Sequence, residues 1–289
     1  VIIHLYLKYG IEYTLNILDG VFAFMLIDNN INKIYLARDV YGVRPLYYII
    51  NENYNFLFKN GIIAFASEIK QLVDIKNEIN KKVGPSGVVI KQYIIHPCKP
   101  GEYIEICKEK TNWYLNRCNR YNSFLLNVQM KFFNKDHQKT NLEQILININ
   151  ELFTKGVKKR VENTDRPVAC LLSGGLDSSI VCSIVNKFYN GKLETYSIGL
   201  EGSEDLKYAK IVAKYLGTIH TEIIMSEDEF FNSIPKVIEM IESYDTTTVR
   251  ASVGNYLIAK YISEHSKYML SIILCNLLSW TFFNGRRKI

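Results

Sequence analysis

The feature that most constrains this chain is the stretch 173–179, which reads Ser-Gly-Gly-Leu-Asp-Ser-Ser. It follows the apolar run 168–172 and precedes the apolar run 180–185. This order predicts a strand, a glycine turn and a helix. Such a turn directs successive backbone N–H groups and a helix N-terminus at one point, which favours a bound phosphate.

The side chains of this loop suit the same ligand. Gly174 and Gly175 let the backbone approach a ligand closely. Three hydroxyls can follow phosphate oxygens: Ser173, Ser178 and Ser179. A carboxylate beside a phosphate repels it, so Asp177 indicates a divalent cation between them, most simply Mg²⁺. The alternative for Asp177 is an acidic residue stabilised by the dipole of the helix that it begins.

The loop differs from two common phosphate-binding motifs. It lacks the lysine of a Walker A loop and the Gly-x-Gly-x-x-Gly spacing of a dinucleotide-binding turn. Without the lysine, transfer of a γ-phosphoryl group is not indicated. The pattern resembles the loop of ATP pyrophosphatases, which hold the leaving pyrophosphate while an acceptor attacks the α-phosphate. The structural alternative is an ordinary strand-to-helix turn rich in small residues.

Length and composition limit the other possibilities. With 289 residues the chain is long enough for two domains. A formal charge of +6 is mild for this length, so no nucleic-acid partner is expected. No membrane partner is expected either. The six cysteines form no Cys-x-x-Cys pair, and a reducing, cytoplasmic location is therefore predicted.

The pattern of apolar segments changes along the chain. Residues 21–28 and 33–38 predict an antiparallel hairpin, the first of several short strands in antiparallel layers. The polar stretch 134–140 is the expected linker, which separates a domain at 1–133 from one at 141–289.

After the linker, helices and strands alternate. Thr140 and Glu143 are placed for a capping box that opens a helix of about twenty residues. One face of this helix is apolar: Leu142, Ile145, Ile149, Leu152, Phe153 and Val157. The later segments predict a doubly wound α/β domain with a parallel sheet. The glycine loop then lies at the carboxyl end of a strand, where such folds bind ligands.

Several segments together resemble the glutamine-dependent asparagine synthetases. The matching stretches are residues 18–24, 37–47, 65–70, 171–179, 197–200 and 244–252. The resemblance implies part of a layered α+β glutaminase domain with an N-terminal nucleophile, followed by the doubly wound ATP-pyrophosphatase domain. It implies that ammonia from glutamine amidates aspartate after ATP has adenylated it, with release of AMP and pyrophosphate. The implied cofactors are ATP and Mg²⁺, and the resemblance is compatible with a homodimer.

The resemblance also assigns roles to individual residues. The backbones of Leu172 and Ile198 would contact adenosine, although both also suit the core of a sheet. Residues 173–179 would hold pyrophosphate, with Asp177 as the Mg²⁺ ligand. Arg250 would stabilise the charge of the transition state, and its alternative is a surface arginine. Asp205 would contact substrate or metal, or else only cap its helix.

The chain departs from the family pattern at both ends. The family nucleophile is a cysteine at the first position of the mature chain, whereas this sequence begins with Val1 and its first cysteine is Cys98. The family's Ser-Gly-Glu-Gly-x-Asp-Glu loop is also missing, and residues 267–289 read as an aberrant tail, the alternative being a genuine membrane or partner segment. We therefore expect a fragment that does not make asparagine by itself.

Other functions share parts of this pattern. A β-lactam synthetase would use the same loop and fold, but residues 244–252 favour the aspartate enzyme. A tRNA-thiolating enzyme would need a catalytic cysteine pair and a basic face. A non-catalytic regulatory homologue would account for the missing nucleophile, yet it has no need of Asp177 beside a phosphate.

Overall fold

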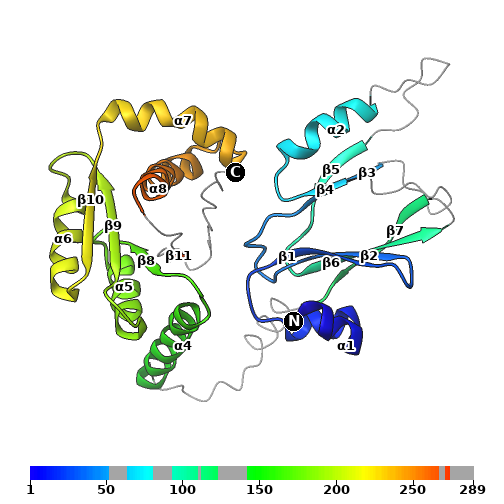
Figure 1. Cartoon of the computed structure of the whole chain (residues 1–289), viewed down its shortest axis with the longest axis horizontal. Coiled ribbons are helices and arrows are strands. Elements are labelled where there is room, and N and C mark those ends of the chain that lie inside the picture. Colours follow the sequence, from blue (N-terminus) through cyan, green and yellow to red (C-terminus); the bar gives the residue numbers. More distant parts are fainter. Residues whose placement is uncertain (52–63, 81–92, 110–111, 123–141, 267–270, 274–289) are drawn as a thin grey trace. The chain divides into compact units, whose positions relative to one another are not determined.

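The computed structural model describes residues 1–51, 64–80, 93–109, 112–122, 142–266 and 271–273 (Figure 1). The chain divides into two compact units, Val1–Asp136 and His137–Ile289. The division falls within the predicted linker 134–140, which itself lies outside the described residues. Both antiparallel and parallel sheets are present, so the fold is mixed α/β.

The first unit contains two antiparallel sheets. Its elements are α1 (Ile2–Ile17), β1 (Ala23–Asp28), β2 (Lys33–Arg38), β3 (Tyr47–Asn51), β4 (Ala64–Ala66), α2 (Lys70–Asn80), β5 (Tyr93–Pro97), β6 (Glu102–Glu109) and β7 (Asn112–Arg120). One sheet has the order β1-β2-β6-β7 and the other β4-β3-β5. The predicted hairpin is confirmed, because β1 pairs with β2 from Ala23 opposite Arg38 to Asp28 opposite Lys33.

Strand β2 shows how the layers of this unit are held together. Successive side chains of a strand point to opposite faces. Leu36 packs with buried residues of the second sheet, including Tyr48. Its neighbours Tyr35 and Ala37 pack instead with Leu15 of α1. The four-stranded sheet is therefore buried on both faces, by α1 on one side and the smaller sheet on the other.

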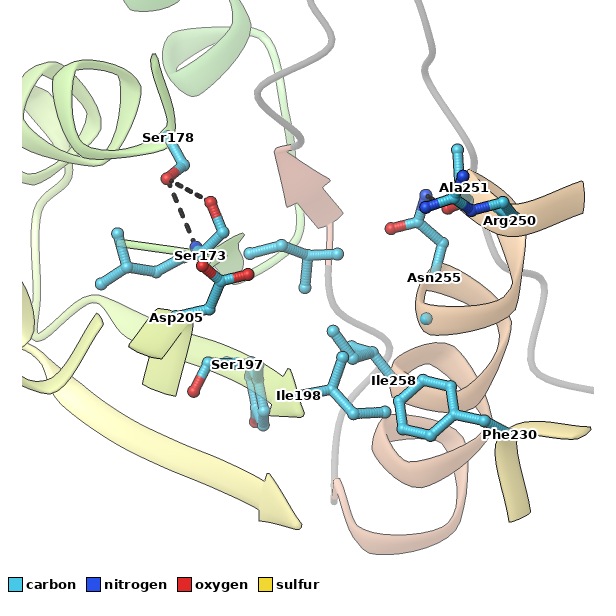
Figure 2. Close-up of a pocket in the computed structure, with 14 residues that line it drawn as sticks. Ser173, Ser178, Ser197, Ile198, Asp205, Phe230, Arg250, Ala251, Asn255 and Ile258 are labelled. Atoms are coloured by element: carbon cyan, nitrogen blue, oxygen red, sulfur yellow. Dashed lines mark hydrogen bonds between the residues drawn. The ribbon is translucent and has the colours of Figure 1, made fainter. Parts of the chain in front are cut away.

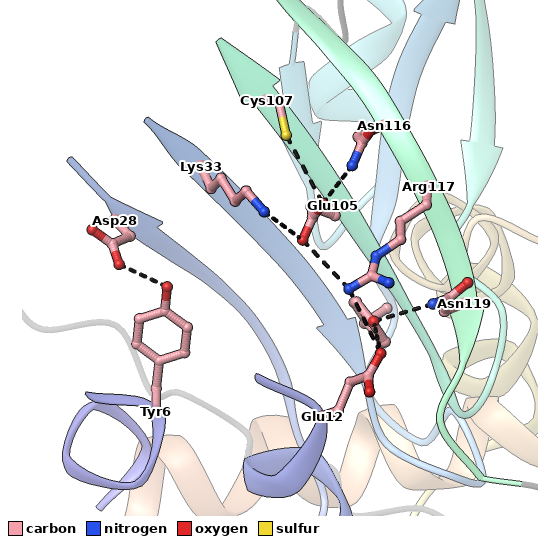
Figure 3. Close-up of polar contacts among 10 residues, drawn as sticks. Tyr6, Glu12, Asp28, Lys33, Glu105, Cys107, Asn116, Arg117 and Asn119 are labelled. Atoms are coloured by element: carbon pink, nitrogen blue, oxygen red, sulfur yellow. Dashed lines mark hydrogen bonds and ion pairs between the residues drawn. The ribbon is translucent and has the colours of Figure 1, made fainter. Parts of the chain in front are cut away.

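A buried carboxylate lies on the α1 side of this sheet. Glu105 is 2% exposed, and its carboxylate lies 3.2 Å from Lys33 Nζ and 3.6 Å from Arg117 Nη2 (Figure 3). Asn116 donates a hydrogen bond to it at 2.5 Å. Arg117 also pairs with Glu12 of α1 at 3.6 Å. These contacts satisfy the buried charge and join the helix to three strands.

The Arg-Asp pair at 38–39 fixes the loop that follows β2. Buried Asp39 accepts backbone N–H bonds from three loop residues: Tyr41, Val43 and Arg44. The Arg38 guanidinium donates to three backbone carbonyls, at 2.6 Å to Gly42, 2.6 Å to Arg44 and 2.7 Å to Cys98. The two side chains therefore satisfy the polar backbone of a tight loop.

The second unit contains a parallel sheet with the order β10-β9-β8-β11. Its elements are α4 (Leu142–Glu162), β8 (Val168–Leu171), α5 (Leu176–Phe188), β9 (Glu194–Gly199), α6 (Glu204–Leu216), β10 (Ile219–Ile224), α7 (Glu227–Ile241), α8 (Thr246–His265) and β11 (Ser271–Ile273). The strand, turn and helix predicted around residues 173–179 are confirmed. Residues 267–270 and 274–289 of the predicted tail lie outside the described residues.

Helices pack on both faces of this sheet. Val168 and Cys170 of β8 pack with residues of α4, α5 and α6, including Val181. The alternate residue Ala169 packs with Ile258 and Ile262 of α8. This arrangement explains why the strands are apolar on both sides.

Two predicted helix ends differ in how far the structure supports them. Gly217 ends α6 in the left-handed conformation at φ 70°, and its N–H bonds to Lys214 O at 3.3 Å, as expected for a C-cap. The capping box proposed for α4 involves Thr140, which lies outside the described residues.

The apolar face of α4 packs on the core only at its C-terminal half. Phe153 and Val157 contact the core of the second unit. The earlier residues of the predicted face are exposed: Leu142, Ile145, Ile149 and Leu152. In the part of the chain that the structure describes, no helix has both the length and the apolar character needed to cross a membrane.

Candidate functional site

A cavity of about 410 Å³ lies within the second unit, at the carboxyl ends of β8 and β9 (Figure 2). The glycine loop forms one wall and α8 forms the opposite wall. It is lined by Leu171, Leu172, Ser173, Ser178, Tyr196, Ser197, Ile198, Asp205, Phe230, Arg250, Ala251, Gly254, Asn255 and Ile258. This position is where open α/β sheets bind ligands.

Hydrogen bonds among its own residues hold the glycine loop in shape. The hydroxyl oxygens of Ser173 and Ser178 lie 3.0 Å apart, and the Ser173 backbone N–H donates to Ser178 Oγ at 3.3 Å (Figure 2). The Ser178 and Ser179 hydroxyls reach Gly175 O at 3.1 and 2.7 Å. Helix α5 then begins directly after Gly175. The loop is thus preorganised, with the positive end of the α5 dipole beside it.

Position 174 of the loop requires glycine. Its φ is +79°, in the region that favours glycine. A Cβ on Gly174 would lie 2.5 Å from Ala209 N and 2.6 Å from Tyr208 Cβ, both on α6. The loop therefore packs closely against the backbone of the neighbouring helix.

Helix α8 presents one face to the cavity. Its N-cap, Asp245, accepts hydrogen bonds from the Thr248 backbone N–H at 2.8 Å and from the Thr248 hydroxyl at 2.7 Å. These bonds hold the pKa of Asp245 below its usual range. Arg250 follows in the next turn and lines the cavity. The cap thus fixes the start of the helix that carries the predicted phosphate-binding arginine.

Six of the predicted site residues line this one cavity: Leu172, Ser173, Ser178, Ile198, Asp205 and Arg250. The remaining predicted residues belong to the glycine loop and the first turn of α5 but do not line the cavity: Gly174, Gly175, Asp177 and Ser179. Arg250 and the loop therefore face the same space from opposite walls (Figure 2).

The two acidic candidates have different surroundings. Asp205 lies in the first turn of α6, whose N-cap is Ser203, and its carboxylate points toward Ser173 in Figure 2. Asp177 is exposed in the first turn of α5. An oxygen donor set of one or two carboxylates, completed by phosphate oxygens and water, suits Mg²⁺. The residues present therefore fit that ion, with Asp205 as the carboxylate inside the cavity.

The prediction from sequence missed most of the cavity's apolar floor and part of its α8 wall. The missed residues are Leu171, Tyr196, Ser197, Phe230, Ala251, Gly254, Asn255 and Ile258. Arg250, Gly254 and Ile258 recur every four residues, so the helical period could have identified that wall. Phe230 comes from α7, and no local sequence signal connects it with the loop.

Comparisons with known proteins cover both units. Residues 1–110 match the protein-family model of the glutamine amidotransferase domain. Residues 148–271 match that of asparagine synthase. Asparagine synthetase [glutamine-hydrolyzing] from Cricetulus griseus is 38% identical over 271 residues, which is 92% of this chain and 46% of that protein. The Homo sapiens protein of the same name gives the same identity and coverage. The chain therefore spans about half the length of the curated relatives it matches.

Two solved structures were also similar in part. The NH3-dependent NAD synthetase of Campylobacter jejuni has a TM-score of 0.29 and 22% identity, over 40% of this chain and 48% of that one. NMN synthetase of Francisella tularensis has a TM-score of 0.30 and 13% identity, over 40% of this chain and 50% of that one.

Along the chain, the match to the glutamine amidotransferase domain precedes the match to asparagine synthase. By sequence, the chain is similar over both units to the glutamine-hydrolysing asparagine synthetases.

Proposed function

We propose that the second unit binds ATP with Mg²⁺ and contributes the adenylating site of a glutamine-hydrolysing asparagine synthetase. One observation carries this proposal: the glycine loop and Arg250 line opposite walls of a single cavity. In this reaction the aspartate β-carboxylate attacks the α-phosphate of ATP and pyrophosphate leaves. Ammonia from glutamine then displaces AMP and gives asparagine.

The proposed roles follow from the position of each group. The backbone N–H groups and hydroxyls of the loop face the leaving pyrophosphate, whose charge the N-terminus of α5 favours. Arg250 faces the α-phosphate, where negative charge increases in the transition state. The apolar floor, including Ile198 and Phe230, is suited to the base of the nucleotide. This second unit would then be a doubly wound ATP-pyrophosphatase domain.

Asp205 and Asp177 are the residues that would hold Mg²⁺ at this site. Asp205 lines the cavity, and Asp177 lies on the adjacent turn. Bound Mg²⁺ would neutralise the phosphates and orient them. The protein's own contribution is to hold these two carboxylates at the edge of the loop.

The first unit would belong to the glutamine-hydrolysing half, as part of a layered α+β glutaminase domain. The cysteines that the structure describes there are unsuited to attack an amide, because a nucleophilic thiol needs a lowered pKa. Burial raises the pKa of Cys98 to about 12 and that of Cys118 to about 11. Burial and the nearby Glu105 carboxylate also raise the pKa of Cys107. We therefore assign the glutaminase nucleophile to none of these three residues.

The substrates proposed for the complete reaction are ATP, aspartate and glutamine. The first test is calorimetric titration of the 289-residue chain with ATP, in the presence and absence of Mg²⁺. We expect Mg²⁺-dependent binding that Asp177→Ala removes. The matched control is Asp228→Ala, which removes another acidic residue from the first turn of a helix, here α7. Equal ATP binding by wild type and Asp177→Ala would contradict the metal role.

Arg250 provides the test of the chemistry. Aspartate-dependent release of pyrophosphate should fall by about 100-fold or more in Arg250→Ala, as when one transition-state donor is removed. Arg166→Ala makes the same change of charge outside the cavity and should have no effect. If the chain alone binds ATP without turnover, each of the two substitutions is made separately in the complete family enzyme, and pyrophosphate release is measured there. Unchanged pyrophosphate release in Arg250→Ala would contradict the assignment.

A further inference from the structure

Helix α8 brings two polar side chains to the cavity, and the proposed function uses only one of them. The α8 residues that line the cavity are Arg250, Ala251, Gly254, Asn255 and Ile258. Arg250 is assigned to the α-phosphate, and three of the others are small or apolar. Asn255 is the remaining polar group, and its side chain extends from α8 toward the glycine loop in Figure 2. Its amide is therefore placed to meet a ligand.

One hydrogen bond determines which end of the Asn255 amide faces the ligand. Asn255 Nδ2 lies 3.1 Å from Ala251 O, one turn earlier in the same helix. A carbonyl oxygen only accepts hydrogen bonds, so the atom beside it is the amide nitrogen and not the amide oxygen. Asn255 Oδ1 has no hydrogen-bond partner among the residues that the structure describes. Figure 2 shows this oxygen directed into the cavity.

The packing of α8 on the sheet holds this oxygen in place. Gly254 lets the helix approach β9, where a Cβ on the glycine would lie 3.6 Å from Ile198 Cγ2. Ile258, one turn later, packs with Tyr196 of the same strand. The helix is thus held against β9 on the turn that carries Asn255. The amide oxygen is therefore preorganised before any ligand binds.

An amide oxygen restricts the kind of group that it can bind. It accepts hydrogen bonds and cannot donate them, so it has no favourable contact with phosphate oxygens, which are acceptors too. Its partner on a ligand is a hydroxyl, an amino or an ammonium group. Phosphate binding therefore does not account for Asn255.

The position of Asn255 along α8 favours one of these donors. A helix rises about 1.5 Å per residue, so Asn255 lies about 7.5 Å along the axis from Arg250 and Ile258 lies about 12 Å from it. Arg250 is at the α-phosphate in the proposed function. Ile258 packs with Ile198 at the apolar floor, where the base is expected. Because the ribose of a nucleotide lies between its α-phosphate and its base, Asn255 falls beside the ribose hydroxyls.

We propose that Asn255 determines specificity for the sugar, because its Oδ1 accepts a hydrogen bond from a ribose hydroxyl of the bound nucleotide. The inference rests on the proposed function, which makes ATP the ligand and assigns its phosphates to the glycine loop and Arg250. Those phosphate contacts and the apolar floor are the same for a ribonucleotide and a deoxyribonucleotide. The preference for the ribonucleotide therefore comes from Asn255.

The first experiment needs no nucleotide. In ¹H–¹⁵N spectra of the full chain, the side-chain amide signals of Asn255 are identified by their loss in Asn255→Ala. Alanine is a strong helix former, so this variant keeps α8. We expect one of the two amide protons to have the smaller temperature dependence of its chemical shift, because it is bonded to Ala251 O. An equal dependence for both protons would overturn the orientation of the amide, whether or not ATP binds.

The second experiment compares nucleotides by calorimetric titration with Mg²⁺ and without aspartate. One of 2′-deoxy-ATP and 3′-deoxy-ATP lacks the donating hydroxyl and should bind the wild type about fivefold more weakly than ATP, the effect of one lost hydrogen bond. Asn255→Ala should weaken ATP binding by a similar factor. It should bind ATP and that analogue equally, since the two changes remove the same bond.

The matched control is Asn16→Ala. Asn16 donates from Nδ2 to the carbonyl of Glu12, four residues earlier in α1, at 2.9 Å. It therefore makes the same local bond as Asn255, but in the other unit of the chain. This variant should keep the wild-type preference for ATP over the deoxy analogue.

The other outcomes separate the ribose contact from the proposed function. Equal discrimination against both deoxy analogues by wild type and Asn255→Ala would overturn the ribose contact. If Asn255→Ala instead lost only the preference for ATP over inosine triphosphate, the donor would be the adenine amino group and the assignment to the sugar would be wrong. Absence of ATP binding by the wild type would refute the proposed function, and the ribose contact with it.

Discussion

The backbone of Gly174 is in direct contact with that of Ala209, so that a Cβ on the glycine would lie 2.5 Å from the alanine nitrogen. The contact joins the cavity loop to α6, and α6 carries Asp205 in its first turn. The position of the loop and the position of that carboxylate are therefore linked through two backbones rather than through flexible side chains.

Gly174→Ala should disrupt both the loop and ATP binding. The substituted residue would hold a φ of +79°, at a cost of about 1–2 kcal/mol, and would force the loop away from α6. The expected result is a loss of about 3 kcal/mol in the free energy of unfolding of the second unit. Urea denaturation and titration with ATP would measure the two effects.

Gly202→Ala is the matched control for that change. Gly202 has a similar φ of +75°, but a Cβ there meets nothing within 4 Å. It should therefore show the conformational cost alone. Equal losses of stability in the two variants would show that contact with α6 is unimportant.

Asp245→Ala should destabilise the start of α8 and weaken ATP binding through Arg250. The carboxylate accepts two hydrogen bonds from Thr248, which lower its pKa from the ordinary 3.8. A group with a lowered folded-state pKa stabilises the protein above its ordinary pKa, and the effect is lost as the pH falls through the folded value. The difference in Tm between wild type and Asp245→Ala should thus be constant near neutral pH and shrink below pH 3.8.

Asp245→Asn separates the hydrogen bond from the charge. Its side-chain oxygen still accepts from the Thr248 N–H, so most of the capping should remain. A Tm difference between wild type and Asp245→Ala that is the same in strong acid as at neutral pH would count against the cap.

Glu105→Gln should destabilise the first unit by about 2 kcal/mol, because it leaves Lys33 and Arg117 without their shared carboxylate. The cost is less than for a fully buried pair, since Lys33 and Arg117 are 32% and 45% exposed. Chemical denaturation of the wild type and variant would measure the difference. Glu151→Gln, which breaks an exposed pair with Lys155 on α4, should cost much less.

The same carboxylate predicts a dependence on pH. Burial raises the pKa of Glu105. The hydrogen bonds from Asn116 and Lys33 and the charge of Arg117 lower it by a larger amount, so that the net pKa lies below the ordinary 4.5. Its contribution to stability is present above pH 4.5 and is lost as the pH falls through the folded value. A stability difference between wild type and Glu105→Gln that grows on acidification would contradict this sign.

Arg38→Lys should loosen the loop after β2. A lysine cannot donate to three separate carbonyls in the fixed directions that the guanidinium uses. The expected loss is about 2–3 kcal/mol in the first unit. Arg120→Lys, on the exposed end of β7, is the comparison, and hydrogen exchange at the Val43 and Arg44 amides would report the change locally.

The glycine loop and the alternation of strands and helices could be predicted because their signals are local. Apolar runs around a Gly-Gly pair dictate a strand, a turn and a helix whatever lies elsewhere in the chain. Leu172 and Arg250 were placed at the site by resemblance, and the structure brings both to one cavity. The nucleotide-binding role of Leu172 and the phosphate-binding role of Arg250 remain predictions.

The rest of the cavity depends on contacts between distant segments. Phe230 reaches it only because α7 and α8 pack together through Val237 and Val253. The 3.2 Å contact between His220 and Ser197 exists only because β9 and β10 are neighbours in register. Phe230 and His220 lie outside the segments that resemble the family, so their positions follow from the packing of α7 on α8 and from the sheet order and not from the local sequence.

Helix α4 shows a case in which the local sequence predicted the element but not its packing. Its apolar period correctly predicted a long helix, but periodicity does not state how much of a face the core can cover. Only the half near Val157 contacts the sheet layer, while Leu142 and Leu152 remain exposed.

The position of β11 has a consequence for how the chain folds during synthesis. β8 pairs with β9 on one side and with β11 on the other, where Ser271 is opposite Val168. Synthesis begins at the N-terminus, so β9 becomes available for pairing with β8 well before β11 does. The other edge of β8 stays open until residue 271 has been synthesised. Pairings between segments so far apart form slowly, and an open strand edge invites pairing with another chain. Pairing of β11 with β8 therefore follows pairing of β9 with β8, and in the interval between them the open edge of β8 can pair with another chain.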